Sequence, residues 1–553
     1  MPAYSTFSDG PGSGRRNSVG DMARRLTRGL KAGAGQASML SSVINLLNTI
    51  VGAGTLTMPS TMSHMGIVFG SMVILWAGFT SALGLYLQSR CARYLDRGHS
   101  SFFALSQLTY PNAAVVFDAA IAIKCFGVGV SYLIIIGDLM PGVALGLLTD
   151  GSDGSEELLA PYLLDRNFWI TAFMLVIIPL SFLRRLDSLK YTSIVALVAI
   201  GYLIVLVVYH FAAEAHPGRG EIRLMTWEGP GAVLRAFPVV VFAYTCHQNM
   251  FSILNEIKDG SPGSIVGVIS GSIGSAAGIY ILVAITGYLT FGNSVAANII
   301  SMYPANIAST IGKAAIVILV MFSVPLQIHP CRASVDAVLK WRPNASSRNA
   351  SAASSGGPSS PNRHNLLLPT AASAPPDDGH GSPVVPMSDL RFALISTVII
   401  VGSYLTALSV SSLDRVLAYV GSTGSTSISF ILPGLFYYKI SDPDSVHHQR
   451  LTKEDDDAGA LDDEVDADED PADLDPSGSG LLESVGSLRS GFSGLSGASG
   501  VRPRSTRWRR QLRWDLEHLE EGLLRKLALA LALYGFGVMA VCLVMNIFFG
   551  AHH

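Results

Sequence analysis

The stretch NTIVGAGTLTMPSTM, residues 48–62, lies inside a run from residue 32 to residue 89 that contains no Asp, Glu, Lys or Arg. That run is long enough for two membrane-spanning helices, which need about 20 apolar residues each. Its first half nevertheless carries Gly52, Gly54 and Pro59, and each Gly weakens a helix by about 1 kcal/mol and each Pro by about 3 kcal/mol. Non-helical backbone inside a bilayer is tolerated only where protein buries it or where it lines a cavity. The sequence therefore predicts a helix whose interruption has a function.

The composition of the whole chain is that of a polytopic membrane protein. Of its 553 residues, 49% are hydrophobic and only 14% are charged, with a mean hydropathy of +0.41. A soluble protein would carry roughly 25% charged residues. We find no phosphate-binding loop, nucleophile motif or metal cluster outside the apolar segments, so the sequence does not favour an enzyme.

The cysteines and the N-terminus give two further expectations. The five cysteines fall in or beside apolar segments without the spacing of a metal site, so we expect neither a metal nor a disulfide framework. The first 35 or so residues are polar, which argues against a cleavable signal peptide.

Apolar runs of the required length predict eleven transmembrane helices. The candidate spans are 40–62, 66–89, 113–140, 167–183, 191–211, 233–255, 264–290, 307–331, 391–413, 416–438 and 525–549. With the N-terminus in the cytosol, the cytosolic segments hold most of the Lys and Arg residues, including the group Arg24, Arg25 and Arg28. The positive-inside rule therefore predicts a cytosolic N-terminus and a C-terminal tail on the lumenal side.

The segments outside the spans have the composition of disordered regions. One loop is rich in Ser, Pro, Ala and Gly, and another holds the run KEDDDAGALDDEVDADEDPADLD followed by a basic stretch. The sequons at Asn344 and Asn349 lie in the first of these loops, which we expect to face the cytosol and to stay unglycosylated. The predicted parts are a disordered cytosolic tail at 1–38, transmembrane helices one to eight at 39–340, a disordered cytosolic loop at 341–388, helices nine and ten at 389–440, a disordered acidic and then basic cytosolic loop at 441–520, and helix eleven with a short lumenal tail at 521–553.

A second interrupted span resembles the first. Span six reads FPVVVFAYTCHQNMFSILNE, residues 237–256, and its middle at 243–249 is polar for a membrane centre. Polar groups at that depth usually face a cavity or the interior of the helix bundle. For His247 two interpretations stay open. It is either a neutral packing residue, or a cavity-lining residue that contacts substrate or takes part in proton coupling.

The two interrupted spans are the first and the sixth. Transporters built from inverted five-helix repeats place their discontinuous helices at corresponding positions of the two halves. Backbone N–H groups at the start of a half-helix suit a carboxylate, and unwound carbonyls suit an amine or a cation. The pattern is typical of a site that holds a zwitterion such as an α-amino acid. Lys124 in span three either pairs with another helix, reaches the membrane surface with its long side chain, or has a functional role.

Three motifs in this order resemble the amino acid/auxin permease family. They are SVINLLNTIVGAGTLTMP at 42–59, CFGVGVSYLIIIGDLMP at 125–141 and FAYTCHQNMFSILNE at 242–256. Within the family, the chain is similar to fungal vacuolar amino acid transporters and to sodium-coupled neutral amino acid transporters. The resemblance implies an all-α fold of the LeuT type, with an inverted 5+5 repeat, one extra helix, and helices 1 and 6 discontinuous. It also implies alternating access around a midplane site.

The resemblance also assigns candidate site residues. The substrate-binding candidates are Gly52, Ala53, Gly54, Thr55, Ala243, Tyr244, Thr245 and His247. Asn48 and Ser323 match the family's sodium site, although a Ser stands where sodium-coupled relatives are expected to have Thr. Sodium binding therefore stays open, and the coupling ion is H⁺ or Na⁺, with no other cofactor.

The function implied by the resemblance is secondary active transport of L-amino acids across the vacuolar membrane, as proton-driven export to the cytosol. The motif TCHQNMF at 245–251 favours this branch. Two alternatives remain open: sodium-coupled neutral amino acid uptake at the plasma membrane, and an amino acid sensor whose inserts signal. The expected partners are an L-amino acid and the lipid bilayer, with no nucleic acid; the oligomeric state and the substrate range are not encoded in any motif.

Overall fold

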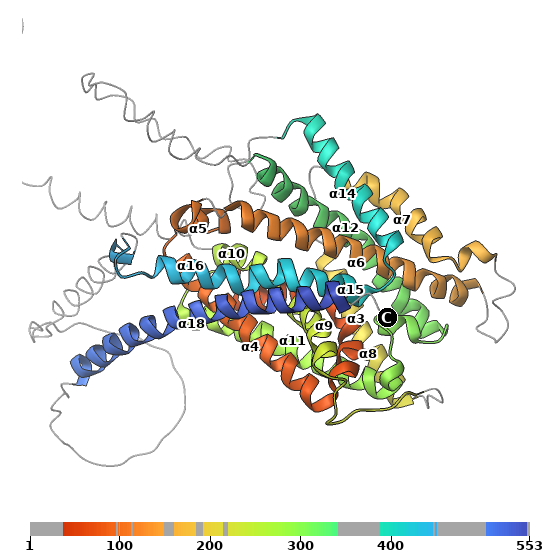
Figure 1. Ribbon diagram of the computed structural model, residues 1–553, viewed down its shortest axis with the longest axis horizontal. Coiled ribbons are helices and arrows are strands. Elements are labelled where there is room, and N and C mark those ends of the chain that lie inside the picture. The colour runs from red at the N-terminus through yellow and green to blue at the C-terminus, as the bar shows by residue number, and fades with distance from the viewer. Residues whose placement is uncertain are drawn as a thin grey trace, which may run out of the picture. The chain divides into compact units, whose positions relative to one another are not determined.

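The structure is a computed structural model that describes residues 37–95, 98, 100–111, 114–148, 160–183, 192–213, 219–340, 387–445, 448–450 and 505–549. Within these ranges it is all-helical apart from one isolated bridge between Ala37 and Ile257 (Figure 1). The longer helices are α2 (Met39–Ile50), α3 (Ala53–Met65), α4 (Ile67–Ala92), α5 (Phe102–Thr109), α6 (Ala114–Leu148), α7 (Arg166–Ser181), α8 (Thr192–Ala213), α9 (Pro230–Ala243), α10 (His247–Glu256), α11 (Pro262–Phe291), α12 (Ile307–Lys340), α14 (Asp389–Ser409), α15 (Leu413–Val420), α16 (Leu432–Ile440) and α18 (Ser505–Phe549).

Seven helices in the described ranges are long and apolar enough to cross a membrane, namely α4, α6, α8, α11, α12, α14 and α18. The pair α2 and α3 passes the same test together and is bent by 58° at the break between them. The other predicted spans coincide with α7, with α9 and α10, and with α15 to α16, each too short to qualify alone. The all-helical fold with an interrupted first span is confirmed, whereas the number eleven stays a prediction.

The two predicted breaks lie side by side. The first span is interrupted at Val51 and Gly52, and the sixth between Ala243, where α9 ends, and His247, where α10 begins. The helices α3 and α9 pack closely, and a β carbon built on Gly54 would lie 2.6 Å from the β carbon of Ala243. No side chain larger than hydrogen fits there, so this glycine permits the approach of the two broken spans.

Span ten differs from the regular helix that the sequence predicts over 416–438. Between α15 and α16 the backbone forms two π-helical segments, η7 (Gly421–Ser425) and η8 (Ser427–Ile431). A β carbon on Gly421 would lie 1.9 Å from the carbonyl oxygen of Pro238, and one on Gly424 would lie 2.7 Å from that of Ala120. The small residues of this segment thus let span ten press against α9 and α6, which both border the breaks.

The last helix begins earlier than predicted. We expected helix eleven from residue 521, after a disordered loop, but α18 starts at Ser505. Leucines at 512, 516, 519 and 523 recur every three or four residues, a helical period that continues into the apolar part. Residues 440–527 group separately from the rest of the chain, and the site described below lies wholly in the other unit. The predicted disorder at 1–36, 341–386 and 451–504, with the two sequons, lies outside the described residues.

Candidate functional site

A cavity of about 460 Å³ lies where the two breaks meet. Residues of α2, α3, α6, α8, α9, α10 and α12 line it. Its volume falls within the range of roughly 300–1,000 Å³ that is usual for small-molecule sites. Of the residues proposed from the sequence, the following line the cavity: Asn48, Gly52, Ala53, Gly54, Ala243, Thr245 and Ser323. The cavity therefore collects residues that are far apart in sequence but belong to the two broken spans and to span eight.

The ends of four half-helices meet at this cavity. The first residues of α3, Ala53 and Gly54, line it, as do Gln248 and Asn249 at the start of α10. Helix N-termini present free N–H groups and a partial positive charge, so they favour an anion such as a carboxylate. The C-terminal ends of α2 and α9 lie at the same breaks and present carbonyl oxygens, which favour an ammonium group. The backbone alone thus offers complementary groups to both charges of a zwitterion.

His247 does not line the cavity. Its ring is fully buried against α4, where Nε2 lies 3.1 Å from the carbonyl oxygen of Ser81. Because a carbonyl oxygen only accepts, Nε2 carries the hydrogen in this contact. The backbone oxygen of His247 in turn accepts a 2.9 Å hydrogen bond from Nε2 of Gln88. These contacts support the packing interpretation, in which His247 holds the break of span six against α4.

Tyr244 and Thr55 are also outside the cavity wall. The carbonyl oxygen of Tyr244 accepts a hydrogen bond from the Ser81 hydroxyl at 3.1 Å, and its ring packs edge-on against Tyr280 at 5.2 Å. Thr55 is fully buried within α3. Of the motif at 243–247, only Ala243 and Thr245 line the cavity, and the side chains of Tyr244 and His247 lie against α4 instead.

Tyr280 on α11 contacts both breaks, and nothing in the sequence indicated this. Its hydroxyl lies 2.7 Å from the carbonyl oxygen of Ile50 and 2.7 Å from that of Ala243. These are the last residues of α2 and α9, so one hydroxyl bridges both interrupted spans. A hydroxyl has a single hydrogen to donate, which the two carbonyls share. Only the fold shows this role, since a Tyr in an apolar helix gives no signal in the sequence.

The family assignment comes from comparison with known proteins. The profile described as "Transmembrane amino acid transporter protein" matches residues 35–455, which is most of the chain. The chain belongs to this family. The predicted resemblance is therefore confirmed at the level of the family.

Several curated relatives resemble this transmembrane amino acid transporter over most of its length. Vacuolar amino acid transporter 5 of Schizosaccharomyces pombe is 45% identical over 408 residues, which cover 74% of this chain and 86% of the relative. Vacuolar amino acid transporter 6 of Saccharomyces cerevisiae is 42% identical over 414 residues, covering 73% and 90%. Sodium-coupled neutral amino acid transporter 7 of Mus musculus is 28% identical over 318 residues, covering 55% and 65%. A crystal structure of MhsT in complex with L-phenylalanine matches with a TM-score of 0.45 and 14% identity, covering 73% of this chain and 89% of that chain.

In this family member, the two residues proposed for an ion both reach the cavity wall. The side-chain oxygen of Asn48 is buried with no hydrogen-bond partner in the described part of the chain, and the Ser323 hydroxyl donates to the carbonyl oxygen of Leu319 at 2.8 Å. Next to Asn48, the Thr49 hydroxyl accepts a 2.9 Å hydrogen bond from the Asn249 amide. The hydrogen bond between Asn249 and Thr49 joins α10 to α2, the two half-helices on the same side of the breaks.

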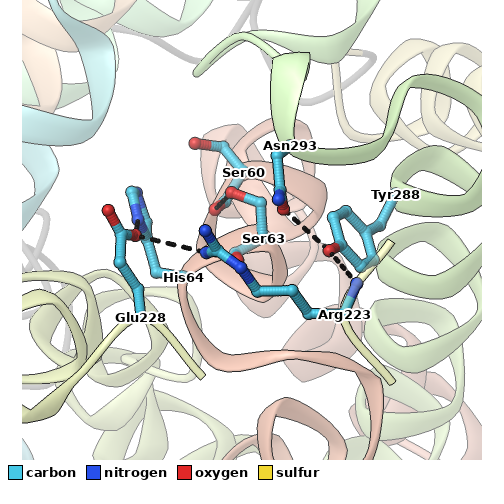
Figure 2. A network of polar contacts seen from close by, with 7 residues as sticks. All are labelled: Ser60, Ser63, His64, Arg223, Glu228, Tyr288 and Asn293. Atoms are coloured by element: carbon cyan, nitrogen blue, oxygen red, sulfur yellow. Dashed lines mark hydrogen bonds and ion pairs between the residues drawn. The ribbon is translucent and has the colours of Figure 1, made fainter. Parts of the chain in front are cut away.

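On the other side of the breaks, a polar network joins the end of α3 to the segment before α9 (Figure 2). Nδ1 of His64 lies 2.5 Å from a carboxylate oxygen of Glu228, and a guanidinium nitrogen of Arg223 lies 3.8 Å from the same oxygen. Arg223 also donates to the carbonyl oxygen of Ser63 at 3.3 Å, and the hydroxyl of Tyr288 on α11 accepts its backbone N–H at 2.8 Å. The network therefore holds the C-terminal end of α3 against the segment before α9 and against α11.

A second hollow of about 290 Å³ adjoins this network, lined by residues that include Ser60, His64, Glu228 and Val239. On α3, Leu56 at the cavity and Ser60 at this hollow are four residues apart, about 6 Å along the helix axis. The two hollows are therefore separated by about one turn of packed helix.

Neutralising Glu228 tests whether the network keeps the α3 end closed. Burial raises the pKa of this carboxyl, but the hydrogen bond with His64 and the charges of His64, Arg223 and Arg235 outweigh it, so that its pKa lies below the ordinary value. The carboxylate is therefore charged above about pH 4.3 and loses its contacts only as the pH falls below that. We expect Glu228→Gln to raise the labelling rate of a Ser60→Cys variant by a water-soluble thiol reagent about twofold to fivefold, because such half-exposed pairs contribute about 0.5–1 kcal/mol.

The control is Glu221→Gln, a change of an exposed carboxylate in the same segment. It should leave the labelling rate of the Ser60→Cys variant unchanged when both backgrounds are compared at pH 7, because the reactive thiolate fraction itself depends on pH. Equal rates in the Glu228→Gln and Glu221→Gln backgrounds would contradict a closing role for the network.

Proposed function

We propose that this protein is a secondary active transporter that moves L-amino acids from the vacuole to the cytosol, driven by the proton gradient. The observation that carries the proposal is the cavity at the paired breaks, where helix N-termini and C-termini offer groups for both charges of an amino acid. The names of the relatives that are 45% and 42% identical, both vacuolar amino acid transporters, support the membrane and the substrate class. The activity is translocation, with no chemical change of the substrate.

Alternating access gives the geometry a mechanism. The cavity reaches from the breaks along α2 and α10, whereas the α3 end is covered by the network of His64, Arg223 and Glu228. With the N-terminus in the cytosol, as the distribution of Lys and Arg favours, the cavity lies toward the cytosol and the covered end toward the lumen. In the transport cycle the turn of α3 and α9 between the two hollows opens on the lumenal side while α2 and α10 close on the other. The C-terminus is then lumenal.

Sodium-coupled uptake at the plasma membrane is the second candidate. It is favoured by Asn48 and Ser323, which both supply side-chain oxygens to the cavity wall, and by the relative named as a sodium-coupled neutral amino acid transporter. Oxygen ligands suit a hard cation. The 28% identity of that relative over 55% of this chain gives it less weight than the vacuolar relatives.

Flux measurements in vesicles distinguish the two candidates. The purified protein is reconstituted, and uptake of radiolabelled L-glutamine, L-leucine, L-glutamate and L-arginine is followed with an imposed pH gradient, with sodium or with choline as the external cation. Our proposal expects accumulation of at least one of these amino acids that follows the proton gradient and does not change when choline replaces sodium. Accumulation that requires sodium and ignores the pH gradient would replace the proposal with the second candidate.

A further inference from the structure

Lys124 on α6 lies in the wall of the cavity, beside the unwound segment of span six. Its side chain is only 5% exposed, and Nζ lies 3.5 Å from the carbonyl oxygen of Thr245 in the unwound segment of span six. The residues that line the cavity include no Asp and no Glu, and Lys124 is the one Lys or Arg among them. The cavity therefore has one strong basic group and no acidic group to balance it.

The surroundings of Lys124 offer no anion in the described part of the chain. The titratable groups that interact with Lys124 are the thiols of Cys125 and Cys246 and the imidazole of His247, and the other titratable residues of the wall are Tyr132 and His329. Burying an ammonium group without an anion is costly, and ionisable residues inside a membrane usually mark a substrate or ion route. The anion that fits this position is one that arrives with a ligand.

We propose that Lys124 is a substrate-binding residue whose ammonium group pairs with the carboxylate of the transported amino acid and carries the coupled proton. This inference rests on the proposed function and names the group that performs its coupling. The carboxylate has two oxygens, so it accepts from the first N–H groups of α3 and from Lys124 together. The carbonyl of Thr245, released from that weak contact, is then free to accept from the ammonium group of the substrate.

The proton follows the carboxylate through the cycle. When an amino acid enters from the lumenal side, Nζ takes one proton from water in the open hollow and forms the ion pair. When the amino acid leaves on the cytosolic side, the ammonium group loses its anion and returns the proton to water there. Each cycle thus moves one proton with one amino acid, and a metal cation is not required, because the fixed ammonium group supplies the positive charge.

Replacing Lys124 by Arg separates its two roles. A guanidinium group keeps the positive charge and binds carboxylates but does not release its proton in proteins. We expect Lys124→Arg to retain exchange of labelled for unlabelled L-glutamine or L-leucine across vesicles without a gradient. The same variant should lose accumulation driven by the pH gradient, and a pH-sensitive dye inside the vesicles should no longer report proton movement with the amino acid.

Replacing Lys124 by Met removes the charge at similar volume. We expect the KM for exchange to rise about tenfold or more, and L-leucinamide, which lacks the carboxylate, to compete as well as L-leucine, whereas in the wild type L-leucine competes better. The matched control is Lys313→Met. Lys313 on α12 is 3% exposed and donates to the carbonyl oxygen of Tyr303 at 2.7 Å, but it does not line the cavity.

The outcomes are distinguishable from a failure of the proposed function. If the wild type exchanges none of the four amino acids, the transport proposal fails. If the wild type transports but Lys124→Arg keeps full proton-driven accumulation, or Lys124→Met changes the KM no more than Lys313→Met does, the role of Lys124 is overturned. Loss of proton coupling in Lys124→Arg with retained exchange supports it, since a merely structural lysine would not separate the two readouts.

Discussion

Replacing Gly54 by Val should reduce amino acid flux in vesicles below detection at normal protein levels. The first added carbon would lie 2.6 Å from the β carbon of Ala243 and 3.0 Å from its α carbon, closer than such atoms approach in folded proteins. The helices α3 and α9 would have to separate at the breaks, where the cavity forms. Because interiors are packed to near crystal density, such a change is transmitted to the neighbouring groups.

The matched control for this prediction is Gly278→Val on α11, where an added β carbon meets nothing within 4 Å. This control should retain near wild-type flux. A double variant tests the mechanism, since Gly54→Ala combined with Ala243→Gly removes the closest contact and should recover part of the flux lost in Gly54→Ala. Normal flux in Gly54→Val, or no recovery in the double variant, would show that the close approach of α3 and α9 is not what the site needs.

Replacing Tyr280 by Phe should destabilise the junction of the two breaks. The change removes the one hydroxyl that lies 2.7 Å from both Ile50 and Ala243 carbonyl oxygens, and leaves those buried acceptors without it. Loss of a buried hydrogen-bonding group costs about 1–3 kcal/mol. We expect a lower midpoint of thermal unfolding in detergent and a drop in flux of about tenfold, the equivalent of about 1.4 kcal/mol.

Tyr202→Phe controls for the loss of a hydroxyl as such. The Tyr202 hydroxyl also donates to a backbone carbonyl, that of Ala308 at 2.9 Å, but it joins α8 to α12 away from the breaks. The Tyr202→Phe variant should have a lower unfolding midpoint without a comparable loss of flux per folded protein. If both variants lose flux in proportion to their stability, Tyr280 has no special role at the breaks.

The sequence predicted the two helix interruptions that form the site. Gly52, Gly54 and Pro59 weaken a helix wherever they stand in an apolar span, so propensity indicates an interruption of span one. Only Gly52 stands at the break, since α3 continues through Gly54 and Pro59. The polar segment at 243–249 marks the second interruption for a related reason, because polar groups are costly at membrane depth. Both breaks are found where they were predicted, and Asn48 and Ser323 reach the same cavity. Their role toward an ion stays a prediction.

The sequence could not predict which way each side chain of an unwound segment points. A helix or a strand has a fixed period, but the segment 244–246 has none, so His247 appeared as a candidate for the cavity although its ring contacts α4. The importance of Tyr280 and of the π-helical segment at 421–431 depends on contacts between distant spans.

The most direct test of the central claim, that an amino acid binds in this cavity and is carried across, is an exchange measurement without any ion gradient. Vesicles with the purified protein are loaded with unlabelled L-leucine, L-glutamine, L-glutamate or L-arginine and diluted into the same amino acid in labelled form. We predict that loading accelerates uptake of the label for at least one of them, and that Gly54→Val abolishes the acceleration. Uptake that is equal in loaded and empty vesicles for all four, or acceleration that persists in Gly54→Val, would contradict the account.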